Sequence, residues 1–198
     1  PSLENIDDLN PLLYFLKNQD PDTKGLGLTD KEYTLIAFYD KICGGEKFWE
    51  MENQDEINSR HVIKKLNLSG EILHNIRRTE FLEGLENITE IEMDCANLNS
   101  VPSFVLTYKK LRKLSLSQNN LEFIPDELSS LSQLRYLDLS KNNNLKKLPE
   151  TIGSLACLEY LNILETKIKE LPRAIEKIPH LTQIIGDAPI FASDKLRT

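Results

Sequence analysis

The sequence predicts an α/β solenoid, with a curved parallel β-sheet on one side and irregular or helical segments on the other. Two observations support this fold class. An apolar template recurs about every 23 residues from the middle of the chain onward, and the segment before it carries apolar residues at helical spacing. We expect a helical N-terminal cap over residues 1–58, five to six repeats over 59–185, and a C-terminal end or cap at 186–198.

The expected N-terminal cap would cover the first repeat, because a stack of repeats exposes apolar side chains at both of its ends. Residues 2–17 place leucine and isoleucine at spacings of three and four, which is the stripe of an amphipathic helix. A second helix is predicted to begin at Thr29, where Glu32 completes a capping box, and to end at Gly44. Trp49 follows it and is expected to pack beneath the first repeat.

The repeating unit reads L-x-x-L-x-L-x-x-N-x-L, and after two further residues comes Leu or Ile with Pro. Copies begin at positions 63, 88, 111, 134, 158 and 181; the first is degenerate and the last incomplete. In x-L-x-L-x the two leucines point inward and their neighbours outward, as in a strand. Asn119 and Asn142 occupy the ninth position, where both ends of an amide can satisfy backbone groups of the turn, whereas Ala96 and Thr166 interrupt this ladder. The proline begins the convex segment, where its missing N–H costs least.

Template and period together resemble those of the leucine-rich repeat family. The resemblance implies one short parallel strand per repeat on a concave face and an irregular or helical return on the convex face. The stretch holding Leu35, Tyr39, Gly44 and Trp49 is similar to the N-terminal cap of bacterial and plant members, although the Trp falls one residue late. The family further implies a scaffold for protein recognition, of the form found in intracellular signalling scaffolds and many bacterial leucine-rich proteins.

The composition and net charge of the chain argue against several classes of binding partner. A net charge of -7 and a pI near 5.1 argue against nucleic acid or an anionic membrane as the main partner, because both attract basic surfaces. No run approaches the roughly 20 apolar residues of a membrane-spanning helix, so no membrane insertion is expected. Cys43, Cys95 and Cys157 are too widely spaced for a disulfide framework and are expected to be buried. Unpaired thiols fit a reducing compartment and equally an exported bacterial protein, so localisation stays open, as does the oligomeric state.

Catalytic chemistry has no visible basis in the chain. Nucleophile-elbow, phosphate-binding, dinucleotide-binding and zinc-protease motifs are absent from the sequence, and its three histidines lack ligands at metal-binding spacing. We therefore expect no catalytic residue, no metal and no cofactor. The alternative is that the chain is the substrate-recognition part of a larger enzyme, such as a bacterial effector ligase or a receptor kinase. The length of the natural open reading frame separates these two hypotheses.

The repeat register also predicts which side chains line the concave face. The third position of successive copies holds Lys65, Glu90, Lys113, Tyr136, Tyr160 and Gln183. Lateral neighbours in such a column lie about 4.8 Å apart, so the first three are expected to neutralise one another. Toward the N-terminal end the face is acidic, and toward the C-terminal end it is apolar, as expected at an interface. The residues we expect to contact another protein are Tyr136, Tyr160, Leu164, Ile185, Asp138, Glu92 and Asp94.

Overall fold

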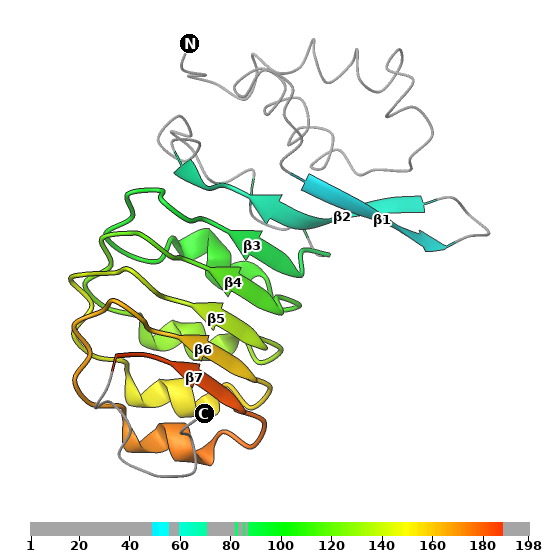
Figure 1. Cartoon of the computed structure of the whole chain (residues 1–198). Helices are drawn as coiled ribbons and strands as arrows, with labels where there is room; N and C mark the ends of the chain where they lie inside the picture. Colours follow the sequence, from blue (N-terminus) through cyan, green and yellow to red (C-terminus); the bar gives the residue numbers. More distant parts are fainter. Residues whose placement is uncertain (1–48, 56–59, 71–81, 83–84, 86, 188–198) are drawn as a thin grey trace.

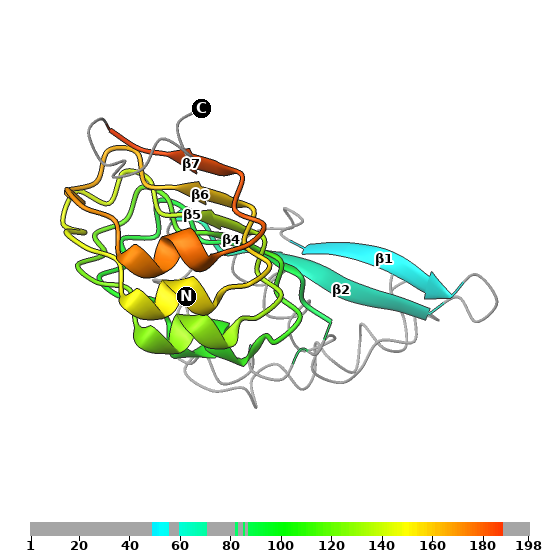
Figure 2. The ribbon, with the colours of Figure 1, turned by 90° about the horizontal axis from the view of Figure 1, so that it is seen from below.

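The computed structural model describes residues 49–55, 60–70, 82, 85 and 87–187. In this part of the chain, strands form one sheet in sequence order, and short 3-10 helices lie behind it (Figure 1). Seen from below, sheet and helices make two separate layers (Figure 2). The strands are β1 (Trp49–Asp55), β2 (Arg60–Asn67), β3 (Glu90–Glu92), β4 (Lys113–Ser115), β5 (Tyr136–Asp138), β6 (Tyr160–Asn162) and β7 (Gln183–Ile185). The 3-10 helices are η4 (Ser103–Thr107), η5 (Asp126–Ser130), η6 (Glu150–Ser154) and η7 (Arg173–Lys177).

Strands β2 to β7 are parallel, and their pairing follows the predicted register. Third-position residues pair with one another from Lys65 in β2 to Gln183 in β7. The fourth-position leucines Leu114, Leu137 and Leu161 are likewise paired and have no exposed surface. A slip of one residue would have turned every leucine toward solvent. The predicted strand in each repeat and the predicted solenoid are therefore confirmed.

Strand β1 was not predicted. It pairs antiparallel with β2, with irregular register in two places, and lies within the segment for which a helical cap was expected. In Figure 2 the β1–β2 pair extends past the side of the repeats. The two helices predicted over residues 2–17 and from Thr29 to Gly44 lie outside the described residues, so the helical cap and the domain boundaries stay predictions.

Strands β2 to β6 are each followed by a left-handed turn at the eighth position of the repeat. The residues with positive φ at this position are Gly70, Cys95, Gln118, Lys141 and Glu165. This turn carries the chain away from the sheet and leaves the eighth side chain near the surface. The expected burial of Cys95 is therefore wrong: its side chain is exposed, and that of Cys157 is half-buried.

Behind the turns, the predicted asparagine ladder is present. Asn119 Oδ1 accepts hydrogen bonds from the N–H groups of Ala96 and Leu98, each at 3.0 Å, and its Nδ2 donates to the Met93 carbonyl at 2.8 Å. These three bonds all reach the preceding repeat. Thr166 bonds only within its own repeat, to the Ile163 carbonyl and from the Ile168 N–H, so the predicted interruption there is confirmed.

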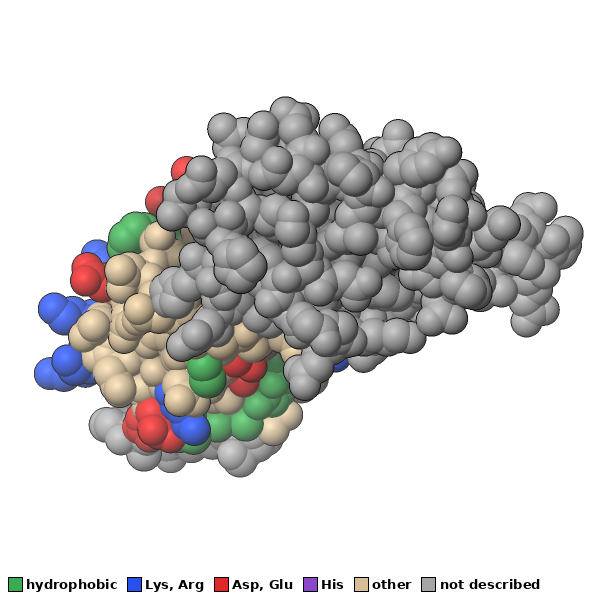
Figure 3. All heavy atoms as spheres, turned by 90° about the horizontal axis from the view of Figure 1, so that it is seen from above, with side chains coloured by type: hydrophobic (Ala, Val, Ile, Leu, Met, Phe, Trp, Pro, Cys, Tyr) green, Lys and Arg blue, Asp and Glu red, His purple; other side chains and the backbone are tan. Residues whose placement is uncertain are grey.

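The convex segment of each repeat begins at the proline, as predicted. A proline stands immediately before each 3-10 helix, and these prolines are Pro102, Pro125, Pro149 and Pro172. In the part of the chain that the structure describes, no helix is long and apolar enough to cross a membrane. Viewed from above in Figure 3, acidic and basic side chains are interspersed along the edge of the described surface.

Candidate protein-binding surface

Two stacked tyrosines form the centre of the C-terminal half of the concave face. Tyr136 in β5 and Tyr160 in β6 pair in register, with ring centroids 4.4 Å apart and ring planes at 4°. Consecutive parallel strands lie roughly 4.8 Å apart, so equal side chains at equal positions stack face against face. Both side chains are half-buried. The structure thus brings together the two tyrosines that the register placed side by side.

Polar neighbours hold this stack in place. The Tyr136 hydroxyl donates to Asp138 Oδ2 at 3.3 Å, and Lys113 Nζ lies 5.7 Å from the centroid of the Tyr136 ring. Burial, the negative charge of Asp138 and the neighbouring Tyr160 raise the pKa of Tyr136, so its hydroxyl stays protonated and donates. Asp138 also accepts from the Ser140 N–H at 2.9 Å and from Asn162 Nδ2 at 3.1 Å. The Tyr136 ring therefore has a neighbour on each face and a hydrogen bond at its hydroxyl.

Two aliphatic side chains lie on the same half of the face. Leu164 and Ile185 are both half-buried, so neither is a core residue. Ile185 pairs with Asn162 across β6 and β7, while the Leu164 N–H donates to Asn162 Oδ1 at 3.1 Å. Beside the tyrosines the face carries small side chains, with Ser117 Oγ and Ser140 Oγ 2.9 Å apart. Apolar surface and a small polar floor are thus adjacent.

The N-terminal half of the face carries a charge cluster that differs from the expected one. Lys113 Nζ lies 2.7 Å and Lys65 Nζ 3.6 Å from Glu92 Oε1, so both lysines reach Glu92. The predicted neutralisation through Glu90 is therefore wrong, because the long lysine side chains reach diagonally into the next column. Burial acts to raise the pKa of Glu92, but the hydrogen bond and charge of Lys113, with the charge of Lys65, outweigh it and leave the pKa lowered. Glu92 is a paired carboxylate.

Asp94, the other acidic residue of the predicted site, links β3 to its neighbours. Its Oδ1 accepts from Ser115 Oγ at 2.6 Å and from the Ser117 N–H at 2.8 Å, and its own N–H donates to Ser69 Oγ at 3.0 Å. Burial raises the pKa of Asp94, the nearby carboxylate of Asp138 adds to this, and the two accepted hydrogen bonds oppose it. Asp94 is therefore committed to the sheet, and the acidic half of the face offers less free charge than the sequence suggested.

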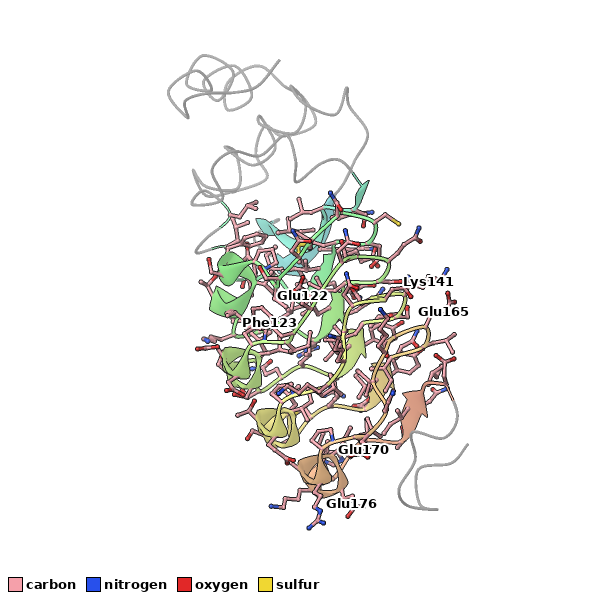
Figure 4. All side chains as sticks on the ribbon, turned by 90° about the vertical axis from the view of Figure 1, so that its left-hand side faces the viewer. Glu122, Phe123, Lys141, Glu165, Glu170 and Glu176 are labelled. Atoms are coloured by element: carbon pink, nitrogen blue, oxygen red, sulfur yellow. The ribbon has the colours of Figure 1, made fainter. Side chains whose placement is uncertain are left out.

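Two residues of interest escaped sequence reasoning. Lys113 lies over the Tyr136 ring, and the signal was available because the two occupy neighbouring places in one column. Phe123 is 53% exposed on the side of the solenoid, between the strands and the 3-10 helices (Figure 4). It fills a variable template position between two buried ones, so the template alone carries no information about it.

Among the described residues, no group of three or more His, Cys, Asp or Glu side chains could hold a metal ion.

A stack of 23-residue units with one strand, one asparagine ladder and one short convex helix each defines a leucine-rich repeat protein. Residues 88–196 match the family model for the leucine-rich repeat region, so the chain belongs to this family. Members are typically non-catalytic and generally mediate protein–protein interaction, although some carry kinase or cyclase activity in separate domains.

The curated relatives that this chain matches are much longer than the chain itself. The probable serine/threonine-protein kinase pats1 of Dictyostelium discoideum is 35% identical over 94% of this chain and 6% of its own length. TMV resistance protein N of Nicotiana glutinosa is 32% identical over 46% of this chain and 9% of its own length. The match spans 12% or less of the full length of these two relatives and of two disease resistance proteins of Arabidopsis thaliana.

Solved structures agree on the fold. A leucine-rich repeat protein of Leptospira interrogans matches with a TM-score of 0.55 and 30% identity, over 60% of this chain and 30% of that chain. The leucine-rich repeat ectodomain of the receptor kinase SOBIR1 from Arabidopsis thaliana matches with a TM-score of 0.54 and 21% identity, over 83% of this chain and all of that chain. The second likeness shows the shared fold alone.

Proposed function

We propose that this chain is a non-enzymatic protein-interaction module that binds a partner protein on the C-terminal half of its concave face. The observation that carries the proposal is the stacked pair Tyr136 and Tyr160, half-buried on the same half of the face as Leu164 and Ile185. Tyrosines and aliphatic side chains gathered on an accessible face have the composition of a binding hot spot. Asp138 lies at the edge of this tyrosine and aliphatic surface, bonded to the Tyr136 hydroxyl. Glu92 and Asp94, already bonded to their neighbours, lie farther toward the N-terminal end of the same face.

Pre-organisation is the second support for the proposal. Association costs free energy when side chains must be ordered, at about 0.5 to 1.5 kcal/mol for each flexible side chain. Here the Tyr136 ring is held by the Tyr160 ring, by Asp138 through its hydroxyl and by Lys113 from the other side. A partner that covers this surface therefore loses little binding energy to ordering it.

The test replaces Tyr136 and Tyr160 singly by Ala and measures affinity by titration calorimetry for a partner captured from the native host. Each variant is expected to lose about 2 kcal/mol or more of binding free energy. Because the rings stack, each should also lose about 0.5 to 1.5 kcal/mol of stability in thermal unfolding, where solvent-facing side chains alone would predict almost none. Tyr136→Phe keeps the stack and should retain most of the affinity.

Lys65→Ala is the matched control, because Lys65 stands in the same column but belongs to the Glu92 charge cluster. It should leave affinity nearly unchanged. Tyrosine variants that bind as tightly as the parent protein would move the binding surface elsewhere and end the proposal.

A second candidate keeps the same surface within a larger protein: the chain serves as the recognition part of an enzyme whose catalytic domain is separate. Its support is the likeness to pats1, of which this chain covers 6%. Reading the natural open reading frame on both sides of the 198 residues tests it. A frame without a catalytic domain removes this candidate and leaves the first one standing.

A further inference from the structure

A groove of about 1420 Å³ lies along the loops that carry the chain from the strands to the 3-10 helices. It is lined by the loops that lead from β5 to η6 and from β6 to η7, and by Asp187. Figure 4 shows Glu170, one of the lining residues, between the strands and the 3-10 helices. The cations that line it are Lys146, Lys147, Lys167, Lys169 and Arg173. We refer to it as the flank groove.

The charge of the flank groove is opposite to that of the chain, which carries a net charge of -7. All five side chains are exposed, and none of their charged groups forms a hydrogen bond or ion pair with any described residue. On the concave face, by contrast, Lys113 binds Glu92, and nearby Arg135 binds Glu159. The lysines of the groove therefore retain their full capacity to attract an anion.

The carboxylates of the flank groove neutralise little of this charge. Glu150 already accepts the N–H of Ala174 at 3.1 Å, and Asp187 accepts the N–H of Glu165 at 3.0 Å. Glu170 is the lining carboxylate without such a bond among the described residues. Like charges gathered in a recess reinforce one another's field and raise the local concentration of oppositely charged ligands.

Below the cations the groove has an apolar floor. Leu148 and Ile168 are buried, and Leu171 and Pro172 are half-buried. A ligand that satisfies both features carries negative charge together with an apolar side chain. A bilayer surface is a poorer fit, because a flat sheet of anionic headgroups cannot reach the floor of a recess.

We propose that the flank groove binds an acidic peptide segment of a partner protein, with its carboxylates at the lysines and an apolar side chain against Leu171. This inference is independent of the concave-face proposal, since it uses other residues. It gives the solenoid a second recognition surface of opposite charge to the chain as a whole.

The experiment measures fluorescence anisotropy of a fluorescein-labelled peptide made of repeated Glu-Glu-Leu units as the full chain is added. Saturable binding that weakens with salt is expected. The double variant Lys147→Glu/Lys169→Glu should bind about tenfold more weakly or worse, because like charges then face each other. Lys109→Glu/Lys110→Glu is the matched control: it changes the net charge equally at exposed positions elsewhere, and should bind within about threefold of the parent.

Each remaining outcome decides the proposal. Absence of saturable binding, or equal loss in both double variants, would show only a diffuse charge effect and overturn it. Sedimentation with phosphatidylserine vesicles that depends on Lys147 and Lys169, without peptide binding, would overturn it in favour of a membrane. Thermal unfolding of the groove variant should match that of the parent, because Lys147 and Lys169 are exposed. The control variant loses exposed hydrogen bonds from Lys109 and Lys110, so its peptide affinity is measured well below its own unfolding transition. Tyr136→Ala should leave the peptide affinity unchanged, which separates this surface from the concave one.

Discussion

Replacing Asn119 by Ala is expected to lower the free energy of unfolding by about 2 to 4 kcal/mol. Asn119 is 5% exposed, and its Oδ1 is the acceptor for the backbone N–H groups of Ala96 and Leu98. Without it both donors lose their partner, and a buried unsatisfied donor costs about 1 to 3 kcal/mol. Two unsatisfied donors would together cost about 2 to 6 kcal/mol. We expect a loss in the lower part of this range, because Leu98 is half-buried and solvent can reach its side of the turn.

The control for this change is Thr166→Ala, at the equivalent position two repeats later. Thr166 Oγ1 donates to the Ile163 carbonyl at 2.8 Å and accepts from the Ile168 N–H at 3.4 Å, both within one repeat. The second bond is long, so its loss should cost about 1 kcal/mol or less. The difference between the two variants measures what the asparagine contributes by joining neighbouring repeats.

Urea unfolding followed by circular dichroism provides the measurement, with the midpoint and the slope determined for each variant. An unchanged slope with a lower midpoint for Asn119→Ala is the expected result. If Asn119→Ala costs no more than Thr166→Ala, the bonds to the preceding repeat contribute nothing measurable, and the reasoning from the ladder is wrong.

Two further changes test the packing and the turns. Gly153→Ala places a Cβ 2.5 Å from the Cβ of Ala174, so η6 and η7 must separate, and the cost should be about 1 to 3 kcal/mol in thermal unfolding. Ser154→Ala is its exposed neighbour and should be almost neutral, and equal melting of the two variants would contradict close helix packing. Lys141→Gly relieves a left-handed φ of 57° and should raise the free energy of unfolding by up to about 1 kcal/mol, seen as a higher urea midpoint, whereas a lower midpoint would show that the turn is unstrained.

The arrangement of the repeats could be predicted from the sequence because one rule, leucine inward and its neighbours outward, is applied again in every copy. Leu114, Leu137 and Leu161 pair in adjacent strands since any other register would expose them. The same rule placed Tyr136 beside Tyr160 on the outer surface. Patterning fixes which face a side chain occupies, and stacking then follows from the spacing of parallel strands.

Other features follow from side-chain reach and from turn geometry, which a column register does not contain. Lys113 and Lys65 meet at Glu92 and not at Glu90, because a long lysine side chain and a glutamate side chain together span the step between neighbouring columns. Cys95 is exposed because it occupies the left-handed turn that ends β3. Strand β1 could not be predicted from the repeat, because it lies before the first copy and pairs antiparallel with β2.

The two proposed surfaces draw on different parts of the same repeats, and the turn at the eighth position separates them. Before the turn, side chains stand on the concave face, where Glu92 and Asp94 are already engaged by neighbours and the free surface is largely aromatic and aliphatic. After it, the loops toward η6 and η7 carry cations without partners among the described residues. Because a solenoid is rigid along its axis and each repeat contacts only its neighbours, a ligand on one side need not disturb the other. The two surfaces can therefore be occupied together, and binding of the acidic peptide should leave the concave-face affinity unchanged.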